Sequence, residues 1–176
     1  MSSKMLITGV SELLGNNLAH YFKDKHTVLG LLNNHSITIP GIEVEYCNPT
    51  DNFSISNLIK DFDPDIILHC VSSYNDYNCK ASSDKTNIHA IKNITESLIK
   101  SISAKLIYIS TDSALDEKTN QEVSEIIQNI KNSLALKTHV FGWNIEDKPS
   151  SPKWILKELK AGKQINEYEN TFFSPI

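Results

Sequence analysis

One apolar run that ends at a glycine and continues into an amphipathic stretch constrains this chain more than any other feature. Residues 4–8, KMLIT, predict a buried β-strand, and Leu14, Leu18 and Phe22 share one face of a helix that follows. Gly9 stands between the two, and Gly15 falls in the first turns of the helix. A strand that passes through a glycine turn into a helix is the first unit of a doubly wound α/β fold.

The rest of the chain repeats this alternation. Five further apolar runs predict strands over residues 26–32, 42–46, 65–71, 104–110 and 134–141. Four further amphipathic patterns predict helices at residues 55–62, 88–102 (after a cap at Ser82–Asp84), 126–130 and 151–163. The last of these has Ser151 as N-cap, Pro152 at the first position and Gly162 at the C-cap. Near-continuous apolarity indicates strands covered on both faces, so we predict an α/β, Rossmann-like, doubly wound parallel sheet.

Composition narrows the class of protein. A chain of 176 residues, 40% of them hydrophobic, fits one domain with a core, and a net charge of −4 disfavours a nucleic-acid or membrane partner. We find neither a membrane-spanning run nor a secretory leader. The three cysteines form no C-x-x-C pair, and the six histidines lack metal-ligand spacing, so we expect a cytoplasmic protein without a metal site.

The turn TGVSELLG, residues 8–15, has the spacing of a phosphate-binding loop. In such loops the first glycine makes the bend, the second lets the backbone approach a pyrophosphate, and the third lets helix and strand pack closely. Gly9 and Gly15 fill the first and third positions, but Glu12 fills the second, where its bulk and negative charge should weaken binding. The predicted cofactor-binding residues here are Thr8, Gly9, Ser11, Glu12, Leu13, Leu14 and Gly15. The alternative is a strand–helix turn that binds nothing.

Two later loops hold further candidates. Asn33, Asn34 and His35 follow the second strand, where an acidic residue would bind the ribose of NAD. Their neutral side chains favour NADP over NAD without deciding between them, and ordinary turn residues would look the same. At residues 48–51 a contact with adenine competes with a helix N-cap at Thr50 or Asp51.

Three segments carry a resemblance to a known family. PDIILHCVSS, NIHAIKN and KLIYISTD, at residues 64–73, 87–93 and 105–112, resemble the extended short-chain dehydrogenases/reductases. With the tail at residues 154–176, which ends in FFSPI, the chain is most similar to the dTDP-4-dehydrorhamnose reductase-like, or sugar nucleotide-binding, family. The resemblance implies NAD(P)-dependent reduction of a nucleotide sugar in dTDP-rhamnose biosynthesis. It also implies an NAD(P)-binding domain over residues 1–148 and a truncated remnant of the substrate-binding region over 149–176.

The same resemblance assigns roles to single residues. Thr111 matches the hydroxyl that holds the substrate carbonyl, which is a catalytic role. The implied cofactor contacts are Val71, Ser72, Ser73, Asn87 and Ser110. The implied substrate contacts are Asp112, Tyr74, Phe173, Ser174 and Pro175, although Tyr74 could equally lie on a surface loop.

One essential motif of that family is missing. Its members carry Tyr-x-x-x-Lys after the fifth strand, yet residues 113–144 contain no tyrosine, and the single match, Tyr21 to Lys25, falls in the first predicted helix. We therefore expect a catalytically impaired chain. The alternatives are a non-catalytic regulatory or scaffold subunit that binds a dinucleotide or nucleotide sugar, or a degraded fragment. A homodimer or a partner protein could complete the site, and Trp143 and Trp154 either pack the C-terminal segment or form an exposed patch.

Overall fold

The structure is a computed structural model of the 176-residue chain. It describes residues 2–32, 36–70, 80–101, 104–110, 117–138, 140, 142–145 and 150–165. Six strands form one sheet: β1 (Lys4–Thr8), β2 (Thr27–Leu32), β3 (Glu43–Tyr46), β4 (Ile66–Cys70), β5 (Lys105–Ser110) and β6 (Ser133–Lys137). Five helices accompany them: α1 (Leu13–Phe22), α2 (Asn52–Phe62), α3 (Lys80–Ser101), α4 (Glu117–Gln128) and α5 (Ser151–Lys160).

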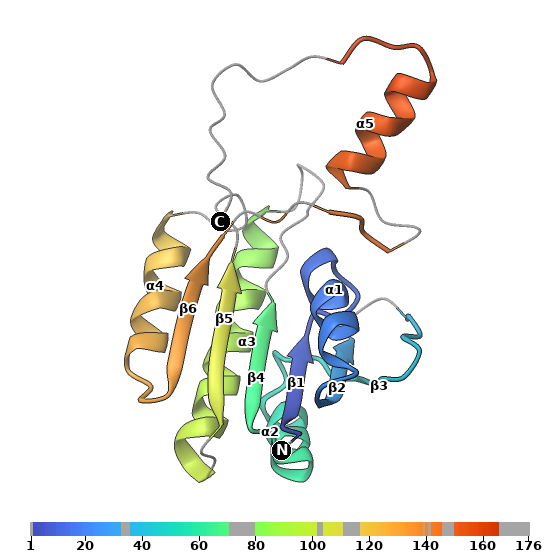
Figure 1. The fold of residues 1–176 in the computed structure, drawn as a ribbon. Helices are drawn as coiled ribbons and strands as arrows, with labels where there is room; N and C mark the ends of the chain where they lie inside the picture. Colours follow the sequence, from blue (N-terminus) through green and yellow to red (C-terminus); the bar gives the residue numbers. More distant parts are fainter. Residues whose placement is uncertain are drawn as a thin grey trace.

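The strand order is β3-β2-β1-β4-β5-β6, and every neighbouring pair is parallel. The chain moves outward from β1 through β2 to β3, then crosses back to β4 and moves outward on the other side (Figure 1). The order reverses between β1 and β4, which is where ligands bind in sheets of this kind. The predicted Rossmann-like, doubly wound parallel sheet is confirmed.

The two faces of the sheet differ in their cover. Helices α2, α3 and α4 pack on one face, where Leu6, Ile67 and Leu106 lie among buried residues of all three helices. Helix α1 packs on the other face, against β1 and β2 (Figure 1). We call these the three-helix face and the α1 face. Among the described helices, none packs on the α1 face over β5 and β6.

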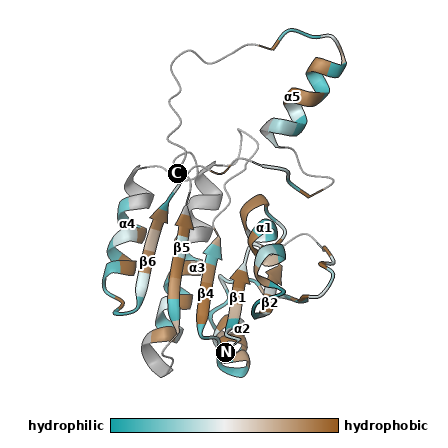
Figure 2. Ribbon diagram, in the orientation of Figure 1, coloured by the Kyte–Doolittle hydropathy of each residue, from teal (hydrophilic) through white to brown (hydrophobic). Residues whose placement is uncertain are grey.

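The outer strand β6 differs from its prediction. We expected a buried strand over residues 134–141, but β6 ends at Lys137 and four of its five residues are exposed. Leu134 and Leu136 keep 49% and 41% of their surface in solvent. A strand at the edge of a sheet has a neighbour on one side only, and no described helix covers the α1 face above β6, so an apolar run does not by itself ensure burial. The inner strands are strongly apolar, as Figure 2 shows.

Helix boundaries show where local signals succeeded. Asp51 is the N-cap of α2, and its side chain accepts hydrogen bonds from the backbone N–H groups of Phe53 and Ser54 at 3.1 and 3.4 Å. The cap interpretation of that loop is thus confirmed. By contrast, the proposed cap at residues 82–84 is wrong, because α3 already begins at Lys80.

The C-terminal helix was predicted one residue too late at its start. Ser150, and not Ser151, is the extended N-cap of α5, so Pro152 falls at the second helical position. Either position suits proline, since the first N–H groups of a helix have no intrahelical acceptor. The helix ends at Lys160, and its C-cap is Ala161 and not the predicted Gly162, which follows with φ +67°. Helix α5 stands apart from the sheet (Figure 1). Among the described helices, none has the length and apolar character that a membrane span requires.

Candidate functional site

Gly9 ends β1 in a conformation that only glycine adopts easily. Its φ is +72°, and a Cβ atom there would lie 2.7 Å from the carbonyl oxygen of Cys70, the last residue of β4. Any side chain would therefore strain the backbone and collide with the neighbouring strand. The turn thus leaves the sheet between β1 and β4, where the strand order reverses.

Gly15 lets α1 approach that turn closely. A Cβ atom on Gly15 would lie 2.2 Å from the carbonyl oxygen of Gly9 and 3.0 Å from the backbone nitrogen of Val10. The contact brings the start of α1 to the carboxyl end of β1, as Figure 1 shows. Both glycines are therefore required by the packing of the chain on itself. They position a helix N-terminus, but they do not demonstrate a ligand.

Glu12 is the N-cap of α1. Its backbone is extended, with φ −108° and ψ 162°, its N–H donates to Gly9 at 2.9 Å, and its carbonyl accepts from Asn16 at 2.9 Å. The Glu12 side chain makes no capping hydrogen bond to the first turn. An extended backbone suits any residue, so a glycine at position 12 would add only room. The helix N-terminus attracts anions, and the Glu12 carboxylate places a negative charge at that same point.

Thr8 and His69 form a buried pair beneath the turn. The two residues face each other across β1 and β4, and Thr8 Oγ1 lies 2.7 Å from His69 Nδ1. Burial lowers the pKa of His69 to about 4, because the charged ring would lose its hydration. Its ring is therefore neutral at pH 7, and it joins the last residue of β1 to the next strand.

His69 is also next to Tyr108 on β5. Their ring centroids are 5.8 Å apart, and the two residues are register partners. Because His69 lies near the end of an apolar strand, the sequence predicts a core histidine with its hydrogen bonds satisfied. It is in the core, but its Nε2 atom is buried and has no hydrogen-bond partner among the described residues, so the prediction of satisfied hydrogen bonds is wrong there. The sequence could have suggested the Thr8–His69 contact, since both are polar residues near the ends of adjacent buried strands.

A later segment lies against the start of α1. The amide of Asn17 donates to the carbonyl oxygens of Leu13 and Trp143, at 2.7 and 3.4 Å. A Cβ atom on Gly142 would lie 3.7 Å from the Leu13 side chain. Residues 142–145 thus border the helix N-terminus. Sequence reasoning missed Asn17, because an asparagine in the second turn of a surface helix carries no distinguishing signal.

For the remaining predicted site residues, the structure describes only the backbone or nothing. Asn87 lies in α3 and Ser110 ends β5, but their side chains are not described. Twelve predicted site residues lie outside the described part: Asn33, Asn34, His35, Val71, Ser72, Ser73, Tyr74, Thr111, Asp112, Phe173, Ser174 and Pro175. Their roles stay predictions. Within the described ranges, no three histidine, cysteine or acidic side chains gather as a metal site would require.

The single Tyr-x-x-x-Lys match lies at the far end of α1 from Glu12. Lys25 Nζ sits 3.7 Å from the centroid of the Tyr21 ring, and a hydrogen bond from Lys25 holds the pKa of Tyr21 below its usual value. Tyr21 belongs to the last turn of α1, and Lys25 follows the helix. The pair is therefore separated from the glycine turn by the length of the helix.

Comparison with solved structures shows the same fold. The enzyme WbmH of Bordetella bronchiseptica, in complex with NAD+, matches with a TM-score of 0.74 and 16% identity over 93% of this chain and 64% of that one. WbmG of the same organism, in complex with NAD and UDP, gives 0.75 and 20% over 94% and 62%. A hypothetical dTDP-4-dehydrorhamnose reductase from Sulfolobus tokodaii gives 0.75 and 21% over 92% and 63%.

This chain therefore spans less than two thirds of the length of those three proteins. Their low identity establishes the shared architecture and nothing finer. A model of the NAD dependent epimerase/dehydratase family matches residues 5–133, which include the glycine turn and the first five strands except Lys4. From this match and the geometry of the turn, we conclude that the chain belongs to the NAD-dependent epimerase/dehydratase family.

Proposed function

We propose that this chain binds a nicotinamide dinucleotide at the turn between β1 and α1. The supporting observation is the Gly9–Gly15 contact, which places the N-terminus of α1 at the point where the strand order reverses. The backbone N–H groups there suit a diphosphate. The neutral residues 33–35 favour NADP, whereas WbmH and WbmG were solved with NAD+ and NAD, so both cofactors belong in the test.

We further propose that the chain derives from a nucleotide-sugar reductase of the dTDP-4-dehydrorhamnose type and has lost most of its catalytic power. The stretch after β5 has no tyrosine to protonate a developing alkoxide, and such general acid catalysis contributes roughly 10²–10⁴-fold. Thr111 would hold a substrate carbonyl. Its hydroxyl is far less acidic than that of a tyrosine, so Thr111 could not take over the role of the missing general acid. The expected result is cofactor and nucleotide-sugar binding with little turnover.

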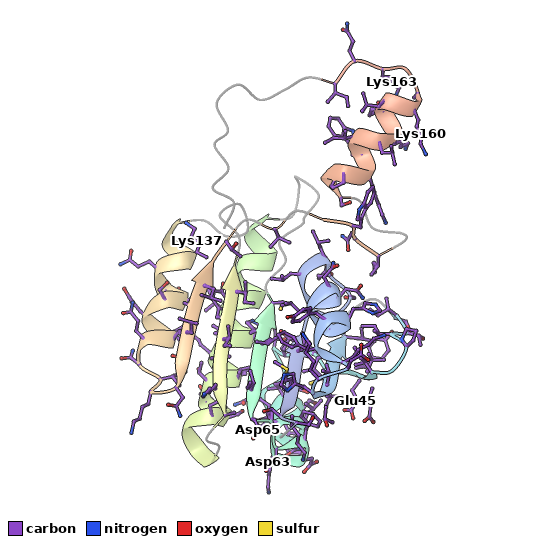
Figure 3. The ribbon with its side chains drawn as sticks, in the orientation of Figure 1. Glu45, Asp63, Asp65, Lys137, Lys160 and Lys163 are labelled. Carbon is purple, nitrogen blue, oxygen red and sulfur yellow. The ribbon has the colours of Figure 1, made fainter. Side chains whose placement is uncertain are left out.

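Glu12 is the residue through which this proposal can be tested. Other acidic side chains, such as Asp63 and Asp65, lie at the opposite, amino end of the sheet, as Figure 3 shows. Glu12 alone among these three stands at the helix N-terminus. Its carboxylate would repel a diphosphate, and a charge pair at about 4 Å near a protein surface interacts by several kcal/mol.

The experiment is calorimetric titration of the native chain, Glu12→Gly and Glu12→Gln with NADPH and with NADH. We expect weak binding by the native chain, and we expect Glu12→Gly to bind the cofactor at least about tenfold more tightly than the native chain does. Glu12→Gln keeps the bulk and removes the charge, so it separates the two effects. Glycine is acceptable as an N-cap, and the helix should stay intact. If neither cofactor binds any of the three proteins, the proposal fails.

A regulatory or scaffold role is the second candidate. It is favoured by the missing tyrosine and by the solvent exposure of Trp143 and Trp154, which are 60% and 49% exposed. Of the two expectations for these tryptophans, packing of the C-terminal segment is therefore wrong. Copurification of a larger enzyme with the tagged chain, lost on replacing both tryptophans with serine, would support this role over solitary catalysis.

A further inference from the structure

The turn that begins at Gly9 leaves the sheet between β2 and β4, and it is anchored differently on the two sides. Toward β2, the Val10 side chain is buried, and the Val10 N–H donates to the carbonyl oxygen of Leu31 at a long 3.4 Å. Toward β4, which lies beside β1 (Figure 1), the anchor is the 2.7 Å hydrogen bond between Thr8 and His69. This short bond therefore fixes the point at which the chain leaves β1.

Neither partner of that hydrogen bond lies on the side of the sheet that carries α1. Side chains two residues apart on a strand share a face. Thr8 follows Leu6 at that spacing and His69 follows Ile67, and both apolar residues belong to the core of the three-helix face. Thr8 and His69 are each only 4% exposed. Any effect of the His69 ring on a ligand at the N-terminus of α1 must therefore pass through Thr8 and the turn.

Close backbone packing links the end of β4 to the start of α1. Gly9 packs on the residue after His69, so that a Cβ atom on Gly9 would lie 2.7 Å from the carbonyl oxygen of Cys70. Gly15 packs on Gly9 in turn, and its own Cβ atom would lie 2.2 Å from the Gly9 carbonyl oxygen. Close-packed atoms transmit displacements. A shift between the ends of β1 and β4 would therefore reach the first turn of α1.

The surroundings of the pair favour one arrangement of its protons. A neutral imidazole carries a single proton, on Nδ1 or on Nε2. If Nδ1 donated to Thr8 Oγ1, the Thr8 hydroxyl proton would need another acceptor, and no described residue supplies one. This favours Thr8 as the donor and His69 Nδ1 as the acceptor. Because His69 Nε2 has no hydrogen-bond partner among the described residues, Thr8 is the one described residue that orients the ring by a hydrogen bond.

We propose that His69 is a positioning residue for the glycine turn. With its proton on Nε2, the ring accepts the Thr8 hydroxyl proton at Nδ1 and holds the end of β1 against β4, which keeps Gly9 and the start of α1 in one arrangement. Without this bond the turn is displaced in a fraction of the molecules, and the apparent dissociation constant of a ligand rises as the competent fraction falls. The effect on a dinucleotide rests on the proposed function, whereas the ordering of the turn does not.

The first test measures the order of the turn in the ligand-free chain, by hydrogen exchange of the Val10 and Glu12 amides, which donate to Leu31 and Gly9. Loss of one hydrogen bond shifts a local opening equilibrium by roughly three- to tenfold. We expect both amides to exchange faster by that factor in His69→Leu, whose side chain is of similar size but has no acceptor. His69→Asn keeps an acceptor two bonds beyond Cβ, where Nδ1 is, and should restore slow exchange.

Ile127→Val is the matched control for loss of core packing. Ile127 is buried in α4 on the same three-helix face, and the substitution removes one methylene group from the core. Urea unfolding measures the global loss of stability in both variants, and only His69→Leu should open the turn. Unchanged exchange at the turn in His69→Leu would overturn the proposal, and so would an equal acceleration in Ile127→Val.

The second test determines which ring nitrogen of His69 carries the proton, from long-range proton–nitrogen correlations at pH 7. In the native chain we expect Nδ1 to show the chemical shift of an unprotonated nitrogen and Nε2 that of a protonated one. Thr8→Val removes the donor, so the Nδ1 shift should move toward that of a nitrogen without a hydrogen bond. A native ring with its proton on Nδ1 would overturn the proposal.

The third test measures ligand binding in a double-mutant cycle, by calorimetric titration with NADPH and with NADH. Glu12→Gly is the background, because the proposed function expects it to bind most tightly. We expect His69→Leu and Thr8→Val each to weaken binding by roughly three- to tenfold, and both together to weaken it no further, since they remove the same bond.

The outcomes of this cycle separate the two proposals. Weaker binding in Thr8→Val with unchanged binding in His69→Leu would mean that Thr8 contacts the ligand directly, and the positioning role of His69 would be overturned. Unchanged binding in both variants would overturn it as well, while the proposed function would stand. If Glu12→Gly itself binds neither cofactor, the proposed function fails, and the exchange and tautomer measurements still decide whether His69 orders the turn.

Discussion

The imidazole of His69 makes the stability of the fold depend on pH. In the folded chain burial holds the pKa of His69 at about 4, against an ordinary value of 6.5. The unfolded chain therefore takes up a proton at this ring between pH 6.5 and 4, while the folded chain does not. The free energy of unfolding should fall as pH drops through that range, by about 3 kcal/mol in total. Urea unfolding at pH 7 and at steps down to pH 4 measures this loss.

His69→Gln provides the control, because an amide can bond to Thr8 without titrating. Carboxyl groups also titrate near pH 4, so the informative quantity is the difference between the native chain and the variant. We expect the native chain to lose more stability on acidification than His69→Gln does. Parallel pH profiles for the two proteins would contradict the assignment of a buried, neutral His69.

A methyl group added to Gly15 should be severely destabilising. Its Cβ atom would lie 2.2 Å from the Gly9 carbonyl oxygen, so α1 must move away from β1. Overpacking of this kind costs typically 1–3 kcal/mol, and we expect Gly15→Ala to reach about 3 kcal/mol or more. Urea unfolding measures the loss. Gly142→Ala is the control, because its Cβ would meet only the Leu13 side chain at an ordinary 3.7 Å. Equal stability of the two variants would refute the close packing.

At the scale of elements, the N-cap of α2 gives a clear prediction. Asp51 accepts backbone hydrogen bonds from Phe53 and Ser54 and a hydroxyl hydrogen bond from Ser54 at 2.6 Å, and these bonds hold its pKa below the usual value. A carboxyl group with a lowered pKa stabilises the fold at neutral pH, and this stabilisation is lost as pH falls below its unfolded pKa and through its lower, folded pKa. Asp51→Ala should lower the urea midpoint at pH 7, by less than Gly15→Ala does.

Asp51→Asn tests the same cap without its charge. Asparagine caps helices about as well as aspartate, so most of the stability should return while the pH dependence at this position disappears. If Asp51→Ala and Asp51→Asn are equally destabilised, the charge and not the hydrogen bonds carries the effect.

Local chemistry was a good guide to elements wherever the signal and the contact lie in the same few residues. The cap at Asp51 and the glycine turn at residues 9–15 are of this kind. The apolar run at residues 134–141 was a poor guide, because the burial of β6 depends on what covers the α1 face of the sheet, and the local sequence does not contain that information. The start of α3 was misplaced for a related reason, since Ser82 and Asp84 can cap a helix or lie inside one.

At the scale of the molecule, the proposed domain boundary at residue 148 can be tested by truncation. The apolar residues Ile155, Leu156 and Leu159 of α5 are exposed, so α5 contributes little to the hydrophobic core. We expect a chain of residues 1–148 to unfold cooperatively, with a urea midpoint close to that of the full chain at concentrations where both are monomeric. Loss of cooperative folding would show that residues 149–176 belong to the same domain, which would overturn the proposed boundary.

The fold could be predicted from the sequence because six apolar runs alternating with amphipathic stretches allow few arrangements besides a doubly wound parallel sheet. The site could be predicted only in part. The spacing of Gly9 and Gly15 predicted the turn. The Thr8–His69 pair and the Asn17–Trp143 contact could not be predicted in this way, because they join residues 61 and 126 positions apart in the sequence. Contacts at such separations follow from topology, and the residues involved have no distinctive neighbours in the sequence.

The Gly9–Gly15 contact has a consequence for how such sequences change over generations. A chain that ceased to bind its cofactor would still have to keep both glycines in order to fold, since each is fixed by backbone atoms of the same molecule. Position 12 carries no such obligation, because its extended backbone accepts any residue. Selection for folding alone would thus preserve Gly9 and Gly15 but would place no constraint on position 12. The residue at position 12 therefore indicates better than either glycine whether cofactor binding is still under selection.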